Sequence, residues 1–164
     1  MTTLEGKPAE PEKVFIFNQE KCTGCMECNV VCAFSHFGVA DFNKSYISII
    51  PDPNKQFYFI GIHCAHCDDP ICKASCPVNA IIKDEKTGLV FIDSLKCIGC
   101  QFCIVACPIS QPRFDIERRV AVKCDFCKSF NYDPRCVKFC PTGALKILPR
   151  EEARKLAQSF RGIK

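Results

Sequence analysis

Sixteen cysteines dominate the chemistry that this 164-residue sequence could perform. One stretch, KCIGCQFCIVACP, places four of them between residues 97 and 107 and follows the last with proline. Thiolate sulfur is a strong ligand for soft metals and metal clusters, so this density indicates metal binding. The sixteen divide into four motifs with none left over: Cys22, Cys25, Cys28 and Cys32; Cys64, Cys67, Cys72 and Cys76; Cys97, Cys100, Cys103 and Cys107; Cys124, Cys127, Cys136 and Cys140.

The gaps between the cysteines indicate the kind of site. The third motif follows C-x2-C-x2-C-x3-C-P, a run in which three cysteines hold one 4Fe-4S cubane and the fourth serves the other cluster of a pair. A tight loop through three cysteines wraps one cubane, and Gly24 and Gly99 allow the curvature. The fourth cysteine, four residues further along a helix face, is carried toward a neighbouring cluster. The first motif continues with Ala33 in place of proline, so its helix is expected to run on through AFSHFG.

Four zinc sites would also use all sixteen cysteines. Zinc fingers and ribbons usually have isolated C-x2-C pairs with longer spacers, whereas two motifs here are contiguous at two-residue gaps and three end in C-x3-C-P. This spacing favours iron–sulfur clusters. Because sixteen cysteines saturate four cubanes, no iron is left open for substrate chemistry, and the clusters are expected to carry electrons.

The order of the motifs predicts how they pair. Residues 76–100 run from a fourth cysteine and proline through a hairpin to the next cysteine loop, which is the linkage expected inside a two-cluster ferredoxin. Motifs two and three therefore form one unit, and motifs one and four form a second around it; CPTGALKIL parallels CPVNAIIK, which supports an internal repeat. Exchange of the fourth cysteine within each unit predicts four sites: Cys22, Cys25, Cys28 with Cys140; Cys124, Cys127, Cys136 with Cys32; Cys64, Cys67, Cys72 with Cys107; Cys97, Cys100, Cys103 with Cys76.

The elements that must position these loops are short. Alternating or continuous apolar runs predict strands over 13–17, 45–50 and 56–62 and a hairpin over 80–93 that turns around 86–88. Residues 149–164 predict a helix, with an apolar stripe at Ala153, Leu156, Ala157 and Phe160. We expect this stripe to pack on its own domain; the alternative is a docking surface for a larger partner.

These elements predict an α+β fold. It consists of two ferredoxin-like dicluster units related by pseudo-twofold symmetry, one inserted into the other, with short strands, short helices and a C-terminal helix. The outer unit comprises residues 13–55 plus 116–148, the inserted unit residues 56–115, and the C-terminal helix or tail residues 149–164.

Histidine and phenylalanine side chains lie inside the motifs. His63 and His66 flank cysteines of the second motif, and either could donate a hydrogen bond to a sulfur and raise a cluster potential, or simply pack as a neutral ring. With all cysteines accounted for, neither is expected to be a ligand. Phe102, Phe126 and Phe139 are expected to shield the cubanes from water.

Composition excludes several other classes of protein. The hydrophobic fraction of 48% argues against disorder. The net charge of +4 comes from basic residues interspersed with acidic ones, which does not favour nucleic-acid binding. No run approaches the roughly 18 apolar residues of a membrane span. The first residues show no export signal, so we expect a cytoplasmic protein, in which dense cysteines bind metal instead of forming disulfides.

The four motifs together resemble a known family. Gaps of two, four and three in the second motif and of two, eight and three in the fourth are similar to those of four-cluster electron-transfer subunits of the DMSO reductase iron–sulfur type. That family includes subunits associated with hydrogenases, carbon monoxide dehydrogenases and formate dehydrogenases. The stretch CAFSHFGVADFNKSYISII is similar to the subunits that accompany tungsten aldehyde oxidoreductases and their benzoyl-CoA reductase relatives. The resemblance implies a string of four 4Fe-4S clusters across residues 13–148.

Three functions follow as hypotheses. The first is an electron-relay subunit, without a substrate site of its own, between a larger catalytic oxidoreductase subunit containing tungsten, molybdenum or nickel and a second redox protein. Its support is the saturated clusters and the absence of a nucleophile, nucleotide loop or metal triad elsewhere in the sequence. The second is a freely diffusing polyferredoxin. The third, from another class, is a zinc-stabilised interaction module.

Overall fold

Four antiparallel strand pairs form the framework of the protein, whose computed structural model describes the backbone of residues 13–160 and the side chains of residues 13–156. The pairs are β1 (Lys13–Phe17) with β8 (Leu145–Pro149), β2 (Ser48–Pro51) with β3 (Phe59–Ile62), β4 (Ile81–Lys83) with β5 (Val90–Ile92), and β6 (Arg113–Asp115) with β7 (Val120–Val122). Three pairs are local hairpins. The pair β1–β8 joins the first and last described strands, from Lys13 opposite Pro149 to Phe17 opposite Leu145.

Short helices follow the cysteine loops. The α-helices are α1 (Glu27–Phe37), α2 (Ile71–Ala74), α3 (Phe102–Ala106), α4 (Arg135–Lys138) and α5 (Arg150–Phe160), and the 3-10 turns are η1 (Gln19–Lys21), η2 (Phe42–Lys44) and η3 (Lys128–Phe130). Helix α3 stops before Cys107, because the residue before a proline is disfavoured in helical conformation. No proline follows Cys32, and α1 continues to Phe37, where Gly38 ends it with a φ of 70°. The predicted continuation of the first helix is confirmed.

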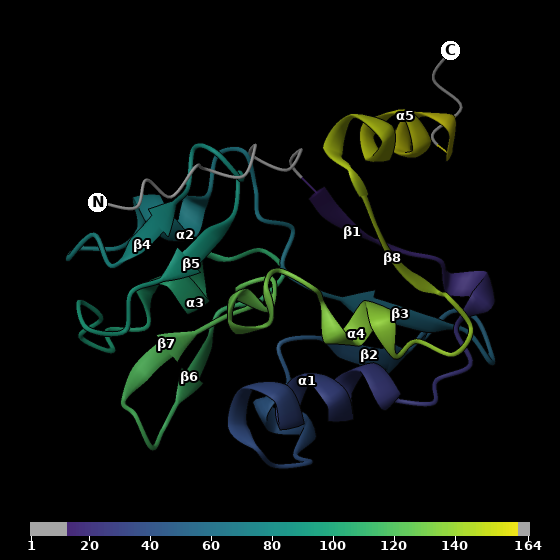
Figure 1. Cartoon of the computed structure of the whole chain (residues 1–164), viewed down its shortest axis with the longest axis horizontal. Coiled ribbons are helices and arrows are strands. Elements are labelled where there is room, and N and C mark those ends of the chain that lie inside the picture. The colour runs from purple at the N-terminus through teal and green to yellow at the C-terminus, as the bar shows by residue number, and fades with distance from the viewer. Residues whose placement is uncertain (1–12, 161–164) are drawn as a thin grey trace, which may run out of the picture.

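The elements gather into two groups (Figure 1). Helices α2 and α3 contact each other and lie with β4–β5 and β6–β7, while α1 contacts α4 and lies with β1–β8 and β2–β3. Helix α5 follows β8 at the edge of the second group and contacts both β1 and β8.

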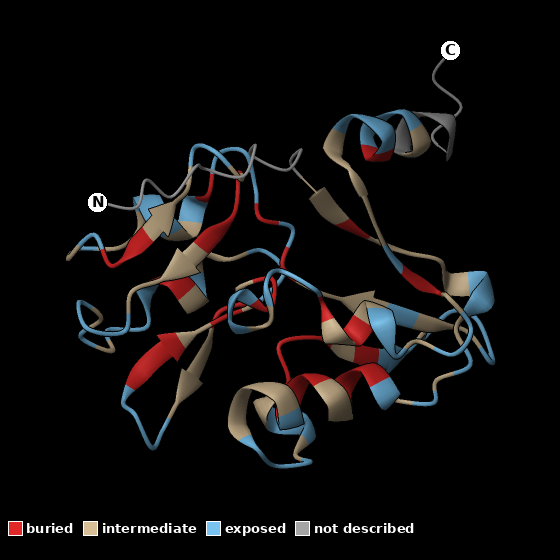
Figure 2. Cartoon of the chain, in the orientation of Figure 1, coloured by how far each residue is buried: buried red, intermediate tan, exposed pale blue. Residues whose placement is uncertain are grey.

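Two clusters of buried apolar residues form the core, and both contain cysteines. The larger one includes Phe15, Tyr46 and Leu145 with Cys28 and Cys136. The smaller one combines Ile81, Val90 and Ala121 with Cys103. Figure 2 shows buried segments in both groups and also where the two groups meet, with exposed loops around them. The core of a chain with so many cysteines is therefore built around sulfur atoms as well as hydrocarbon.

Several predicted elements are confirmed, and others were missed. The strand at 13–17 and the hairpin at 81–92 are present as predicted. The strands predicted at 45–50 and 56–62 form a shorter pair, β2–β3. The hairpin β6–β7 and the strand β8 were not predicted; β6 and β7 have three residues each, which are too few to show a period. The predicted unit boundaries after residues 55 and 115 fall inside the turns of β2–β3 and β6–β7.

The predicted C-terminal helix is present as α5, which begins one residue after Pro149. Ala153 of its apolar stripe is buried against the protein, in agreement with packing on its own domain. The side chains of Ala157 and Phe160, and residues 161–164, lie outside the described part. Within residues 13–160, none of the helices has the length and apolar character needed to cross a membrane.

Candidate metal centres

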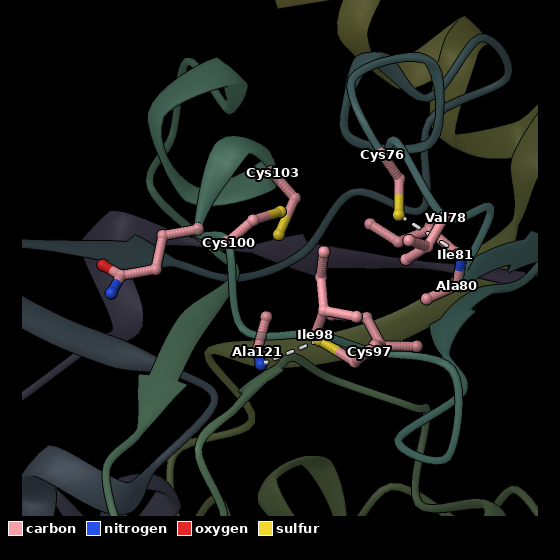
Figure 3. Close-up of a pocket in the computed structure, with 11 residues that line it drawn as sticks. Cys76, Val78, Ala80, Ile81, Cys97, Ile98, Cys100, Cys103 and Ala121 are labelled. Carbon is pink, nitrogen blue, oxygen red and sulfur yellow. Dashed lines mark hydrogen bonds between the residues drawn. The ribbon is translucent and has the colours of Figure 1, made fainter.

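One pocket combines cysteines from two motifs. Cys97, Cys100 and Cys103 of the third motif and Cys76 of the second line the same apolar hollow (Figure 3). Ile81 and Ala121 complete its wall from the neighbouring strands. This grouping has the composition of the site predicted from exchange of the fourth cysteine.

A second pocket has the same composition in the other half of the molecule. Cys22, Cys25 and Cys28 of the first motif line it together with Cys140 of the fourth. The β1–β8 pair brings these distant segments together, because Phe17 precedes the first loop and Leu145 follows the last cysteine. Three sulfurs of the first motif and a fourth from more than a hundred residues later in the chain thus line one pocket.

Several of the remaining cysteines have neighbours from another motif, whose charge acts on their pKa. Burial raises the pKa of the Cys136 thiol, and negative charge on Cys32 and Cys127 raises it further. Burial also raises the pKa of Cys72, and charge on Cys64 and Cys107 adds to the rise. Cys67 is exposed at the rim of the second loop, and Cys124 is half-buried near Cys64 and Cys136.

The four loops share one backbone conformation. In the first C-x-x-C segment of each motif, the residue before the second cysteine has a left-handed backbone, a conformation that only glycine adopts without cost. Glycine takes this position in loops one and three, and buried aromatic rings take it in loops two and four: Gly24 (φ 70°), His66 (φ 44°), Gly99 (φ 70°) and Phe126 (φ 60°). The expectation that Gly24 and Gly99 permit the curvature is confirmed.

A second repeated feature follows the fourth cysteine. In the three motifs that end in Cys-Pro, the residue three positions after the cysteine is left-handed: Asn79, Ser110 and Gly143. This turn aims the next amide at the sulfur, with Ala80 N donating to Cys76 Sγ at 3.2 Å and Gln111 N donating to Cys107 Sγ at 3.5 Å. Cys32, which no proline follows, instead accepts from Tyr46 N at 3.3 Å.

Burial raises the pKa of eight of these thiols in the metal-free protein. It raises the pKa of Cys28 to about 12 and the pKa of Cys103 and of Cys127 to about 11. Cys140 differs: burial raises its pKa, but the amides of Leu145 and Ala144 and the Thr142 hydroxyl outweigh burial and bring the pKa below its ordinary value. Metal binding must therefore displace protons from these buried thiols, whereas the lowered pKa of Cys140 favours its thiolate.

Comparison with known proteins identifies the centres. The 4Fe-4S dicluster domain matches residues 55–150, and a 4Fe-4S binding domain matches residues 14–39. The chain belongs to the 4Fe-4S dicluster domain family. The predicted 4Fe-4S cofactors and the predicted resemblance to iron–sulfur electron-transfer subunits are confirmed.

Relatives of this dicluster protein are chains of anaerobic reductases. It is 36% identical to the probable anaerobic dimethyl sulfoxide reductase chain YnfG of Escherichia coli, over 86% of this chain and 75% of the relative. It is 33% identical to the thiosulfate reductase electron transfer subunit PhsB of Salmonella typhi, over 82% and 74%. It is 36% identical to the polyferredoxin-like subunit of an aliphatic sulfonate oxidoreductase of Pyrococcus furiosus, over 84% and 79%.

Among solved structures, the chain is similar to one in the active site complex BamBC of benzoyl coenzyme A reductase as isolated. The TM-score is 0.48 with 20% sequence identity, over 92% of this chain and 90% of that chain.

The residues of the dicluster protein fit 4Fe-4S clusters on structural grounds. All sixteen cysteines are free of disulfides, and backbone amides point at sulfurs in each motif that ends in Cys-Pro. Within the described side chains, no group of three or more His, Cys, Asp or Glu is close enough to hold a single metal ion, whereas each pocket is lined by four sulfurs. A cluster of several atoms spans this wider spacing.

The histidines of the second motif are both buried. His63 packs edge-on against Phe15 with ring centroids 5.3 Å apart, and burial lowers its pKa. His66 is 1% exposed, and burial, reinforced by the charge of Lys123, lowers its pKa well below the ordinary value. Both rings are therefore neutral, which is compatible with hydrogen-bond donation and with simple packing; the ring nitrogens His63 Nδ1 and His66 Nε2 find no hydrogen-bond partner among the described residues.

Two polar residues near the cysteine loops were not predicted from the sequence. His36 Nε2 lies 3.7 Å from Cys127 Sγ and 3.7 Å from Asp125 Oδ1, although it is ninety-one residues from that cysteine. Lys123 is 5% exposed and precedes Cys124 directly. No sequence signal identifies the contact of His36, because it depends on tertiary packing; a lysine directly before a cysteine motif is a weak local signal for a charge near the cluster.

The phenylalanines differ in how well they cover the centres. Phe126 is 2% exposed and lies in the apolar cluster with Cys28, Cys32 and Cys136, as expected of a shielding ring. Phe102 and Phe139 are exposed on the surface of their short helices. Their predicted shielding role is wrong for the isolated chain, because a helix of four or five residues directs only one face inward and the cysteines take it.

Proposed function

We propose that the chain is the electron-relay subunit of a multi-subunit anaerobic oxidoreductase and holds four 4Fe-4S clusters. The observation that carries the proposal is the pair of pockets in which three cysteines of one motif meet the fourth cysteine of another. When bound, such clusters accept and release single electrons without changing their ligands. The protein's own part is to hold the sulfurs, direct amides at them and keep water away.

The proposed ligand sets are those of the fourth-cysteine exchange. The two pockets support the sets completed by Cys76 and Cys140, and the electrostatic neighbours of Cys72 and Cys136 support those completed by Cys107 and Cys32. The repeated left-handed positions in the loops support two related dicluster units, one inserted in the other, with a pseudo-twofold relation between them.

The proposed partners are a larger catalytic subunit with tungsten, molybdenum or nickel and a second redox protein, all in the cytoplasm. Support comes from relatives that are named as chains or subunits of reductases. Exposed apolar side chains around the third cysteine loop, namely Leu95, Ile98, Phe102 and Val105, further support a protein partner, since large patches of this kind mark interaction sites. The chain itself is proposed to have no substrate site.

Anaerobic affinity purification of the tagged chain from its own cells tests the proposal. We expect about sixteen iron atoms per chain and a stoichiometric large subunit with tungsten, molybdenum or nickel. Recovery of the brown chain alone would instead establish a free polyferredoxin. A colourless chain, or one with half the iron, would contradict the four-cluster assignment.

A further inference from the structure

A buried polar chain connects the two halves of the molecule. His66 of the second cysteine loop, Val90 of β5 and Lys123 beside the fourth loop are 1%, 1% and 5% exposed. Val90 N donates to His66 Nδ1 at 2.9 Å. On the other side of the same residue, Lys123 Nζ donates to Val90 O, and it also donates to Cys124 O at 3.1 Å. The backbone of one residue therefore joins a histidine and a lysine from different cysteine loops.

The hydrogen bond from Val90 fixes the histidine tautomer. Because Nδ1 accepts the amide hydrogen, it carries no proton, and the ring hydrogen lies on Nε2. Nε2 is buried and has no acceptor within the described part of the chain. A buried donor without an acceptor is strongly disfavoured, so this N–H indicates an acceptor that the side chains do not supply.

Lys123 has a similar need for a negative partner. Both of its hydrogen-bond acceptors are backbone carbonyls, and no described carboxylate forms an ion pair with its ammonium group. Burial raises the pKa of Cys72 and of Cys124, and the positive charge of Lys123 opposes both increases. The ammonium group therefore acts on one cysteine from each half of the molecule.

We propose that Lys123 and the Nε2–H group of His66 set the reduction potentials of the two clusters that face the junction, those held by the Cys64 and Cys124 ligand sets. The inference rests on the proposed ligand sets. Reduction adds one negative charge to a cluster, and a fixed cation or an N–H donor in a buried site stabilises that charge, which raises the potential. Because Lys123 lies between the Cys64 and Cys124 ligand sets, its charge stabilises the reduced state of both clusters. His66 and Lys123 are positioning residues and not ligands.

The competing explanation is purely structural, since Lys123 also ties β5 to the fourth cysteine loop. Three variants of the full holoprotein separate the two. Lys123→Met removes the charge and keeps the length of the stem, and Lys123→Arg keeps the charge. His66→Asn tolerates the left-handed backbone and retains an acceptor for Val90 N, but it has no group at the Nε2 position. Lys86→Met, at the exposed turn of the same hairpin, is the control for loss of one positive charge.

The measurement is an anaerobic reductive titration followed by paramagnetic resonance, after iron has been counted. We expect Lys123→Met to retain full iron and to lower the potentials of two clusters while the other two stay fixed. Lys123→Arg and Lys86→Met should leave all four potentials near those of the unmodified protein. His66→Asn should lower one or two of the same potentials.

Unchanged potentials in fully loaded Lys123→Met would overturn the inference. If Lys123→Met loses iron, His66→Asn becomes the test. Unchanged potentials in iron-replete His66→Asn would overturn the role of Lys123 and His66, and a decrease confined to the potentials of the two junction clusters would support it. Failure of the proposed function has a different signature, namely fewer than four clusters in the unmodified protein.

Discussion

The rings of His66 and Phe126 meet edge to face, with centroids 5.8 Å apart and planes at 77°. Each belongs to the residue that precedes the second cysteine of its loop, and each has a left-handed backbone. In the other two loops this position is glycine. The protein thus accepts backbone strain in loops two and four and gains a packed aromatic contact between them, at the place where its two halves meet.

Removal of the Phe126 ring should destabilise the protein. The ring also packs against Phe15 at 4.7 Å and is 2% exposed, so Phe126→Ala leaves a cavity in the larger apolar cluster. We expect a loss of about 3 kcal/mol in the free energy of unfolding. Anaerobic denaturant titration of the loaded protein measures it. The matched control is Phe139→Ala in the same motif, whose ring is 44% exposed; an equal loss there would contradict the prediction.

Gly99→Ala should disrupt one cluster site. The residue has a φ of 70°, and an added Cβ would collide with the carbonyl oxygen of Arg119. We expect loss of about a quarter of the iron, since the loop through Cys97, Cys100 and Cys103 cannot keep its shape. Gly38 has the same φ with open space around it, so Gly38→Ala tests the effect of the left-handed backbone without a collision. We expect it to keep full iron and to lower the free energy of unfolding by only about 1 kcal/mol. Similar iron loss in both variants would show that φ, and not the collision, is decisive.

Exchange of the fourth cysteines predicts which cluster each substitution damages. Cys76→Ala should impair the cluster held by the third loop, because Cys76 shares a pocket with Cys97, Cys100 and Cys103. Cys107→Ala should impair the cluster of the second loop and spare that of the third. Paramagnetic spectra of the reduced variants distinguish the two. The reverse pattern would refute the exchange.

The metal-free chain should lose stability in alkaline solution. Burial raises the pKa of Cys28 to about 12 and of Cys103 to about 11, above the ordinary value near 9. Stability from neutral, buried thiols is complete below pH 9 and is lost as the pH rises through the folded-state values, because the unfolded chain ionises first. The denaturant midpoint of the metal-free chain should therefore fall between pH 9 and pH 11.

Two comparisons isolate the thiols in this alkaline titration. The double variant Cys28→Ser with Cys103→Ser should show a smaller decrease, because serine does not ionise in this range. The iron-loaded protein should also show a smaller decrease, since its ligands are thiolates already. A midpoint that rises with pH in the metal-free chain would contradict the argument.

The cysteine loops could be predicted because their determinants are local. Spacing, Gly24, Gly99 and the prolines after Cys76 and Cys107 act over a few residues, and the missing proline after Cys32 correctly predicted a longer helix α1. The same locality made the hairpin β4–β5 visible, with its turn near Gly88.

Features that depend on distant packing could not be predicted. The contact of His36 with Cys127 joins two motifs through tertiary structure, and Lys123 is buried only because β5 and the second loop fold over it. His66 combines a local and a distant feature. Its place beside a cysteine was evident from the sequence, but its tautomer depends on the hydrogen bond from Val90, and its ring packs on Phe126. The short strands β6 and β7 offer too few residues for a pattern.

The pairing of β1 with β8 also fixes an order of events during synthesis. The first cysteine loop leaves the ribosome earliest, yet the pocket that it lines is completed by Cys140, near the end of the described chain. The four sulfurs of the pocket of Cys76 with Cys97, Cys100 and Cys103 are all present as soon as the third loop has been made. The sulfurs of the first loop are therefore synthesised first, but their ligand set is completed last. A chain truncated shortly before residue 140 retains all four sulfurs of the Cys76 pocket, whereas its other pocket lacks Cys140.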